Sequence, residues 1–169
     1  PGTVAIEAET GYLRRRDGSW DHATVFNPIV GAAPRLELSA ELPLIIKGGA
    51  GLKGRGGLGD ANLQAKSVLP REEGRRPAVA VRGVFKTDSG AEARGMGSGD
   101  KEFTAAVMAT KKEGGNSLHA MLGRAFPGRS FDDSLRDSTF YGLGLNYALD
   151  ARWSVLAETF GSTRPDARG

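Results

Sequence analysis

The chain contains the stretch Arg35-Leu36-Glu37-Leu38-Ser39-Ala40-Glu41-Leu42-Pro43-Leu44, in which polar and apolar residues alternate. Successive side chains of a β-strand point to opposite faces, so the leucines and Ala40 would share one face and the charged residues the other. The stretch therefore predicts a β-strand with one apolar face and one polar face.

The same alternation recurs along most of the chain. No stretch of helical periodicity separates the repeats, and glycine- or proline-containing turns join several of them into hairpins. The pattern predicts an all-β, antiparallel protein, either a closed barrel or a sandwich. We expect strands at about residues 3–13, 20–30, 35–46, 60–69, 78–87, 103–109, 118–122, 139–147 and 153–160.

The connections alternate between short turns and longer polar segments. Residues 149–152 form a short turn, whereas we expect loops at residues 47–57, 88–101 and 127–137. Outer-membrane barrels show this asymmetry, with short periplasmic turns and longer outer loops, and they carry aromatic girdles near the strand ends, where aromatic residues also gather here. We therefore predict an antiparallel up-and-down transmembrane β-barrel of the outer-membrane type.

The number of strands complicates closure of such a barrel. We count about nine, whereas single-chain bacterial barrels use an even number. The sequence begins at Pro1 without an export signal and ends in a polar segment. We therefore expect an incomplete barrel, with one partial domain over residues 1–161 and a polar tail or linker to missing strands over residues 162–169.

Composition limits the other classes of function. No run of about 18 apolar residues is present, and a mean hydropathy of -0.33 suits membrane strands as well as soluble ones. Cysteine is absent and the two histidines, His22 and His119, are far apart, so we predict no metal and no cofactor. Acids and bases are interspersed and the net charge is only +3, so nucleic acid is not an expected partner.

Charged and amide side chains fall on one side of the expected strands. The other side carries almost no charge, with Arg124 as the main exception near an expected strand end. A charge facing lipid costs about 2–4 kcal/mol at mid-membrane and much less near the edges. We therefore interpret the apolar side as facing lipid and the polar side as the wall of a lumen, with an ordinary solvated sheet face as the alternative. The expected lumen-lining residues are Glu7, Glu9, Glu37, Glu41, Asn62, Gln64, Lys66, Arg82, Lys86, Asn146 and Glu158.

One glycine-rich stretch matches a nucleotide-binding pattern. Gly54-Arg55-Gly56-Gly57-Leu58-Gly59 fits G-x-G-x-x-G. That chemistry needs a helix after the glycines, whereas residues 60–69 alternate with a period of two and stop at Pro70. We interpret the stretch as part of a flexible loop.

Several short motifs resemble a known family. They are Pro34-Arg35-Leu36-Glu37-Leu38, Gly57-Leu58-Gly59-Asp60, Phe85-Lys86-Thr87-Asp88-Ser89-Gly90 and Tyr141-Gly142-Leu143-Gly144-Leu145-Asn146-Tyr147-Ala148-Leu149, with Arg152 and Ala157-Glu158. Over most of residues 4–161 the chain resembles the outer-membrane proteins of the phenol-degradation meta-pathway family. The resemblance implies an outer-membrane β-barrel with a role in the passage of aromatic or other small hydrophobic compounds, and it supplies no catalytic residues.

We predict a passive channel or transporter-like protein in the outer membrane of a Gram-negative bacterium, and not an enzyme. Its partners would be outer-membrane lipid and a small-molecule solute, and the loops at residues 47–57, 88–101 and 127–137 would select solutes at the mouth of the lumen. One alternative is a soluble lipocalin-like or β-sandwich module that binds a small ligand with its apolar face turned inward. Another is a structural or adhesion barrel with a blocked lumen.

Overall fold

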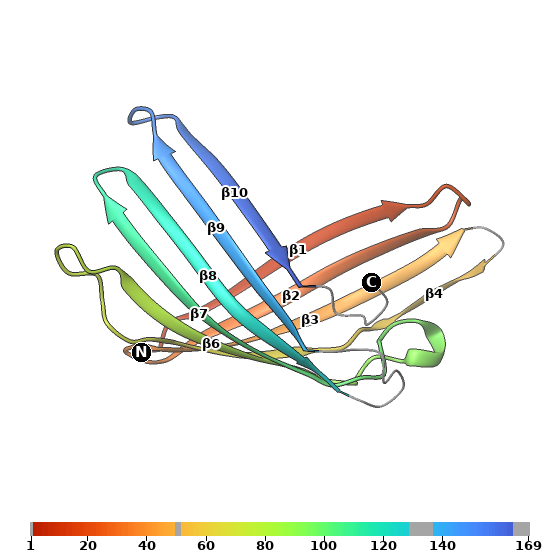
Figure 1. Cartoon of the computed structure of the whole chain (residues 1–169). Helices are drawn as coiled ribbons and strands as arrows, with labels where there is room; N and C mark the ends of the chain where they lie inside the picture. Colours follow the sequence, from red (N-terminus) through yellow and green to blue (C-terminus); the bar gives the residue numbers. More distant parts are fainter. Residues whose placement is uncertain (1, 50–51, 129–136, 164–169) are drawn as a thin grey trace.

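The strands that the described residues form all belong to one antiparallel sheet (Figure 1). The computed structural model describes residues 2–49, 52–128 and 137–163. A 3-10 turn, η1 (Glu92–Arg94), lies between β6 and β7. The strands are β1 (Val4–Arg14), β2 (Trp20–Ala33), β3 (Leu36–Gly49), β4 (Leu52–Leu58), β5 (Asn62–Val68), β6 (Ala78–Lys86), β7 (Glu102–Glu113), β8 (Asn116–Pro127), β9 (Ser138–Ala148) and β10 (Ser154–Ser162).

Tight turns decide where several strands end. Gly18 between β1 and β2 has a φ of 82°, and Gly114 between β7 and β8 has a φ of 57°. Both values lie in the left-handed region that glycine adopts without a steric penalty. Only Pro34 and Arg35 separate β2 from β3. Links this short force consecutive strands to pair with each other.

The strands follow one another across the sheet in the order β1-β2-β3-β5-β6-β7-β8-β9-β10, with β4 attached to β3. β4 pairs with residues 44–49 of β3, and β5 pairs with residues 36–41. Where they meet, the Gly59 amide donates a hydrogen bond to the Pro43 carbonyl oxygen at 2.8 Å. β4 and β5 therefore share one position in the sheet. The described residues form ten strands, one more than the expected nine, and the additional strand is β4.

The prediction of a loop at residues 47–57 is wrong. β3 continues to Gly49 and β4 begins at Leu52, so most of this segment is a hairpin. A β-ladder is built from backbone groups, which glycine has like any other residue. Met96 also packs against Gly57, with its Cγ 3.5 Å from the point where a Cβ would stand. The G-x-G-x-x-G stretch is thus strand β4 and its exit, and not a flexible loop.

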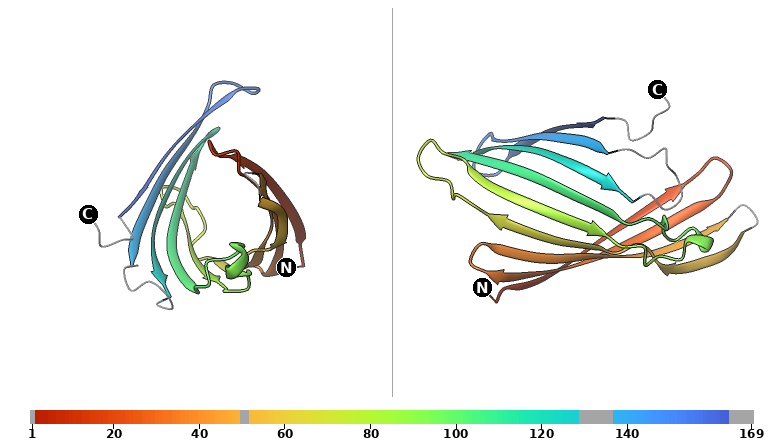
Figure 2. Two further views of the ribbon diagram at one scale, coloured as in Figure 1. Left: turned by 90° about the vertical axis from the view of Figure 1, so that its right-hand side faces the viewer. Right: turned by 60° about the horizontal axis from the view of Figure 1, so that its bottom comes forward.

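The sheet bends into an open arc. It curves from β1 (red) through the middle strands to β10 (blue), and the connection that contains η1 lies within the curve (Figure 2). β1 pairs with β2 and β10 with β9, so each has one unpaired edge within the described residues. The predicted antiparallel, up-and-down order is confirmed, but a closed barrel is not observed. A sandwich does not describe this single sheet.

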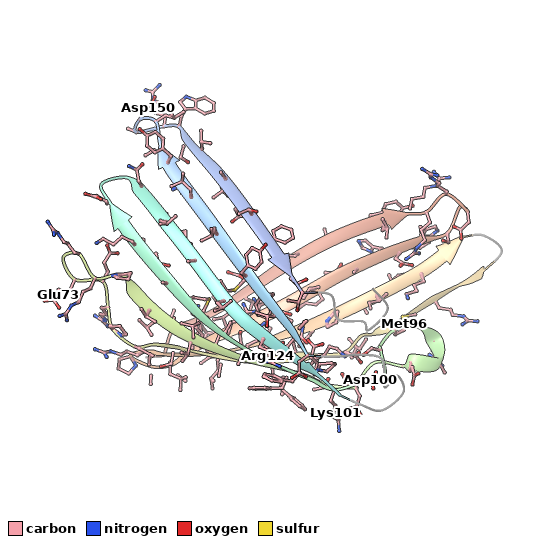
Figure 3. All side chains as sticks on the ribbon, in the orientation of Figure 1. Glu73, Met96, Asp100, Lys101, Arg124 and Asp150 are labelled. Atoms are coloured by element: carbon pink, nitrogen blue, oxygen red, sulfur yellow. The ribbon has the colours of Figure 1, made fainter. Side chains whose placement is uncertain are left out.

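The apolar side chains do not collect into a core. Among the described residues, the buried hydrophobic ones are Met96 and Ala106, with exposed fractions of 2% and 6%. Leu63, Val107 and Leu143 are about half exposed, at 50%, 51% and 52%. Within the described residues no second layer covers the sheet, and side chains project from the ribbon along its length (Figure 3). The apolar stripes of neighbouring strands therefore form one uncovered surface on this chain.

Aromatic rings cover glycines on neighbouring strands at three places. Trp20 lies over Gly48, Phe140 over Gly123, and Tyr141 over Gly161. At each of these glycines a Cβ would stand within 2.7 Å of a ring atom, closer than real contacts allow. The missing side chain therefore makes room for the ring, and each pair favours a single register between its two strands.

We expect the change Gly123→Ala to lower the free energy of unfolding by about 1–3 kcal/mol, the usual cost of overpacking. Gly83→Ala is the matched control, because its Cβ would stand 3.8 Å from the nearest atom, Cε2 of Phe103. Urea titration of both variants, refolded in the same detergent, measures the difference. Equal stability of the two variants would show that the ring of Phe140 does not fix this register.

Candidate functional site

One face of the sheet lies on the inside of the arc. Met96 packs against Gly57, which pairs with Ile45 and so shares its face. Met96 follows η1, and the connection carrying η1 lies within the curve (Figure 2). We call this the inner face and the opposite one, which carries Leu38 and Val107, the outer face.

The register places all of the expected lumen-lining residues on the inner face. Cross-strand pairs connect them in rows, such as Glu37 with Lys66 and then Arg82. The residues concerned are Glu7, Glu9, Glu37, Glu41, Asn62, Gln64, Lys66, Arg82, Lys86, Asn146 and Glu158. They do not form one cluster, because they are spread from β1 to β10.

The middle of the inner face holds a hydrogen-bonded polar group of residues on β3 and β5. Lys66 Nζ donates to Glu37 Oε1 at 2.7 Å, with both side chains more than a third exposed. The Glu41 carboxylate accepts from Asn62 Nδ2 at 2.7 Å and from Gln64 Nε2 at 2.5 Å. An ion pair as exposed as that of Glu37 contributes only about 0–1 kcal/mol. These residues therefore make a polar surface rather than a strong stabilising network.

The two basic residues of β6 are held differently from each other. The Nε atom of Arg82 is buried and has no hydrogen-bond partner among the described residues. Lys86 instead donates to the Ser98 hydroxyl and the Asp100 carbonyl oxygen, each at 2.5 Å, and its Nζ is 3.4 Å from Asp60 Oδ2. Lys86 thus belongs to the attachment of the connection between β6 and β7, a role that the alternation pattern did not indicate.

At the two ends of the sheet, the expected residues lie in separate places. Glu7 and Glu9 of β1 line a hollow of about 200 Å³ together with Val25, Asn27 and Glu41. Asn146 and Glu158 are on β9 and β10. The structure therefore brings the acids of β1 close to Glu41 of β3 but keeps them apart from Glu158.

A groove of about 410 Å³ crosses the inner face of β7 to β10. Its side-chain walls come from Met108, His119, Met121, Glu158 and Phe160. Of these residues, only Glu158 is predicted from the sequence, because the lumen wall is predicted from polar residues alone. The signal that could have found the others is the presence of methionine and phenylalanine on the polar side of their strands.

The segment at residues 88–101, here called the 88–101 loop, folds over the inner face and is anchored by Asp60. The Asp60 side chain is 8% exposed. Its Oδ1 accepts from the Gly90 amide at 2.9 Å, and its Oδ2 accepts from the Ser98 amide at 2.8 Å. Met96 and Asp100 lie beside η1 in this loop (Figure 3). The predicted loop at this position is therefore held by hydrogen bonds to Asp60 and Lys86. Most of the loop predicted at residues 127–137 lies outside the described residues.

The ionisation of Asp60 is tied to this anchoring. Burial alone would raise the pKa of Asp60, but hydrogen bonds from Ser98 and Gly90 and the charge of Lys86 outweigh it, so the pKa lies below the ordinary value of 3.8. A carboxyl whose pKa is lowered by folding stabilises the fold above its unfolded pKa. The anchor is therefore complete at neutral pH and is lost as the pH falls through the lowered pKa.

Within the described ranges, no group of three or more His, Asp or Glu residues is arranged to hold a metal ion. No helix in those ranges is long and apolar enough to cross a membrane.

The fold and the inner face define an antiparallel β-sheet protein with an apolar convex surface and a polar concave one. A family model described as "Putative MetA-pathway of phenol degradation" matches residues 1–167, nearly the whole chain. The protein therefore belongs to this family, which confirms the resemblance seen in its short motifs. No curated protein matches the chain.

We expect Asp60→Asn to loosen the 88–101 loop. The amide nitrogen that replaces one carboxylate oxygen cannot accept a hydrogen bond, so the bond from Gly90 or the bond from Ser98 is lost. Hydrogen bonds to charged groups contribute about 1.5–3 kcal/mol, so amide exchange in the loop should accelerate about tenfold or more at pH 7. Asp88→Asn is the control, since Asp88 meets Lys101 at 3.6 Å with both side chains about half exposed. Exchange followed by mass spectrometry would contradict the anchor if both variants matched the unchanged protein.

Proposed function

We propose that this protein is an outer-membrane protein of a Gram-negative bacterium and gives small aromatic or other hydrophobic compounds a passive route across that membrane. Its membership in a phenol-degradation family supports the class of solute. The proposal assigns it passage of a solute rather than catalysis.

The uncovered outer face is the observation that carries this proposal. Three residues on the outer face of the neighbouring strands β7, β8 and β9 are more than half exposed. They are Val107 at 51%, Leu122 at 60% and Leu143 at 52%. Soluble monomers rarely expose apolar patches larger than a few hundred Å². Hydrocarbon around this face would remove the cost of exposing it to water.

The height of the apolar band fits a bilayer. Leu36 and Ile46 bound the outer-face apolar residues of β3. At about 3.3 Å per residue the two are about 33 Å apart along the strand. A strand tilted by about 45° would then cross about 23 Å, close to the apolar band of about 25 Å on outer-membrane barrels.

The charge of Arg124 is accommodated near one end of this band. Arg124 is three residues from the end of β8 at Pro127, and its guanidinium lies 3.0 Å from Asp137 and 5.6 Å from the ring centre of Phe126. Phe103 stacks beside Phe126 with ring centres 6.2 Å apart. Aromatic rings and a paired arginine are typical of the membrane interface, where charge costs little.

The inner face would supply the route. Acids gather on β1 and β3, at Glu7, Glu9, Glu37 and Glu41, whereas β5 and β6 carry the bases Lys66, Arg82 and Lys86. Closing the arc around a lumen would require pairing at the free edges of β1 and β10. The soluble alternative needs the apolar face turned inward, which is the reverse of the arrangement seen here.

Passage can be tested in liposomes that contain the protein. We expect entry of phenol-sized aromatic solutes above the rate of empty liposomes, because a polar lumen bypasses the bilayer. Protein denatured before reconstitution is the control. Rates equal to those of empty liposomes, with the protein inserted, would reject passage and favour a blocked barrel.

Contact with lipid can be tested by placing arginine on the outer face. Val107 is central in β7, whereas Leu118 is two residues from the start of β8, and their exposed fractions are similar, 51% and 53%. In lipid, Val107→Arg should lower the free energy of unfolding by about 2–4 kcal/mol and Leu118→Arg by about 0–1 kcal/mol. Changes within about 0.5 kcal/mol for both would instead indicate a face exposed to water.

A further inference from the structure

We propose that the groove on β8, β9 and β10 is a binding slot for a neutral hydroxyaromatic compound, a single ring bearing a hydroxyl group. The inference rests on the proposed function, because it places a binding step for the same class of solute on the inner face. It goes further by naming the residues and the chemical group that they select.

Two glycines form the floor of the slot. The register aligns His119, Gly144 and Glu158 in one row across three strands. The next row holds Met121, Gly142 and Phe160. Neither glycine has a side chain, so an open channel runs along β9 between β8 and β10, which are about 9.6 Å apart at two strand spacings.

The walls beside Gly142 suit an aromatic ring. Met121 leans over this glycine, with its Cε 3.6 Å from the point where a Cβ would stand. Phe160 stands opposite, on β10. Thioether groups and aromatic rings both make favourable contacts with aromatic ligands. The groove volume of about 410 Å³ lies in the range of about 300–1,000 Å³ found for small-molecule sites.

The row beside Gly144 supplies the polar end. Glu158 Oε1 lies 3.7 Å from the point where a Cβ of Gly144 would stand. Within the described part of the chain, the Glu158 carboxylate takes part in no ion pair. His119 is already engaged, since Nδ1 meets the Thr110 hydroxyl at 2.9 Å and Nε2 meets the Ser117 hydroxyl at 3.0 Å. Glu158 is therefore the group that can accept a hydrogen bond from a ligand.

An acceptor with a negative charge selects its ligand chemically. A phenolic hydroxyl has a pKa near 10, so at pH 7 it is neutral and donates a hydrogen bond. Bonds to ionised acceptors are stronger than neutral ones. An aromatic carboxylate such as benzoate would be repelled by Glu158, and toluene would keep the ring contacts without the hydrogen bond. The slot should therefore prefer phenol to toluene, and toluene to benzoate.

Methionine methyl groups give a local readout of binding. The chain has three methionines, Met96, Met108 and Met121. Met108 and Met121 line the groove, whereas Met96 belongs to the 88–101 loop and is buried, at 2% exposure. In the full chain labelled at its methionine methyl groups and held in lipid nanodiscs, phenol should shift the signals of Met121 and Met108 through its ring current. The signal of Met96 should stay in place.

Two variants separate the polar end from the floor. Glu158→Gln keeps the shape but removes the charge, so the dissociation constant for phenol should rise about tenfold while that for toluene stays unchanged. Gly142→Ala combined with Gly144→Ala adds methyl groups at ordinary contact distances of 3.6 Å or more, so both ligands should bind about tenfold more weakly in a fold that is retained. Glu102→Gln and Gly11→Ala are the controls, and neither should change binding.

The outcomes are distinct from those of the passage test. No shift of Met121 with saturating phenol, or a phenol affinity unchanged by Glu158→Gln, would overturn the slot even if liposomes showed passage. Shifts that follow the predicted variant pattern would support the slot even if no passage were measured, and in that case only the proposed transport would fail.

Discussion

The structure depends on one constraint: a single β-sheet layer satisfies its backbone through hydrogen bonds between strands, but it cannot bury either of its faces by itself. The two buried hydrophobic residues among those described, Met96 and Ala106, are far too few to form a core. What stabilises the chain must therefore come from the ladder and from whatever surrounds the sheet. The residue types on each face therefore indicate which surroundings, lipid or water, that face requires.

The alternation of residue types made most of the fold predictable. A period of two assigns each side chain to a face, and tight turns such as that around Gly114 force neighbouring strands to pair. The up-and-down order followed from these two features, and so did the placement of Glu37, Lys66 and the other polar residues on a common face. The open arc was not predictable in the same way, because the local pattern does not say whether the outer edges of β1 and β10 pair, and in the structure they do not.

Each of the remaining differences has an identifiable physical cause. The glycine-rich composition of β4 predicts a loop, whereas its backbone hydrogen bonds with β3 make the segment a strand. The 88–101 loop is held by Lys86 and by Asp60, which bonds to Gly90 and Ser98, 30 and 38 residues away along the chain. The groove was missed because Met121 and Phe160 are apolar residues on a polar face. The attachment of the 88–101 loop depends on contacts between segments far apart in the sequence, which periodicity cannot reveal.

The rings that cover glycines have a consequence for assembly. A shift of one residue between β8 and β9 would move Phe140 away from Gly123 and would also turn every side chain of the slipped strand to the wrong face. Three such ring-and-glycine fits lie on β2–β3, β8–β9 and β9–β10. Each of these contacts fits in one register only. The register of each strand pair can therefore be selected when that pair forms, and this selection does not require a closed barrel.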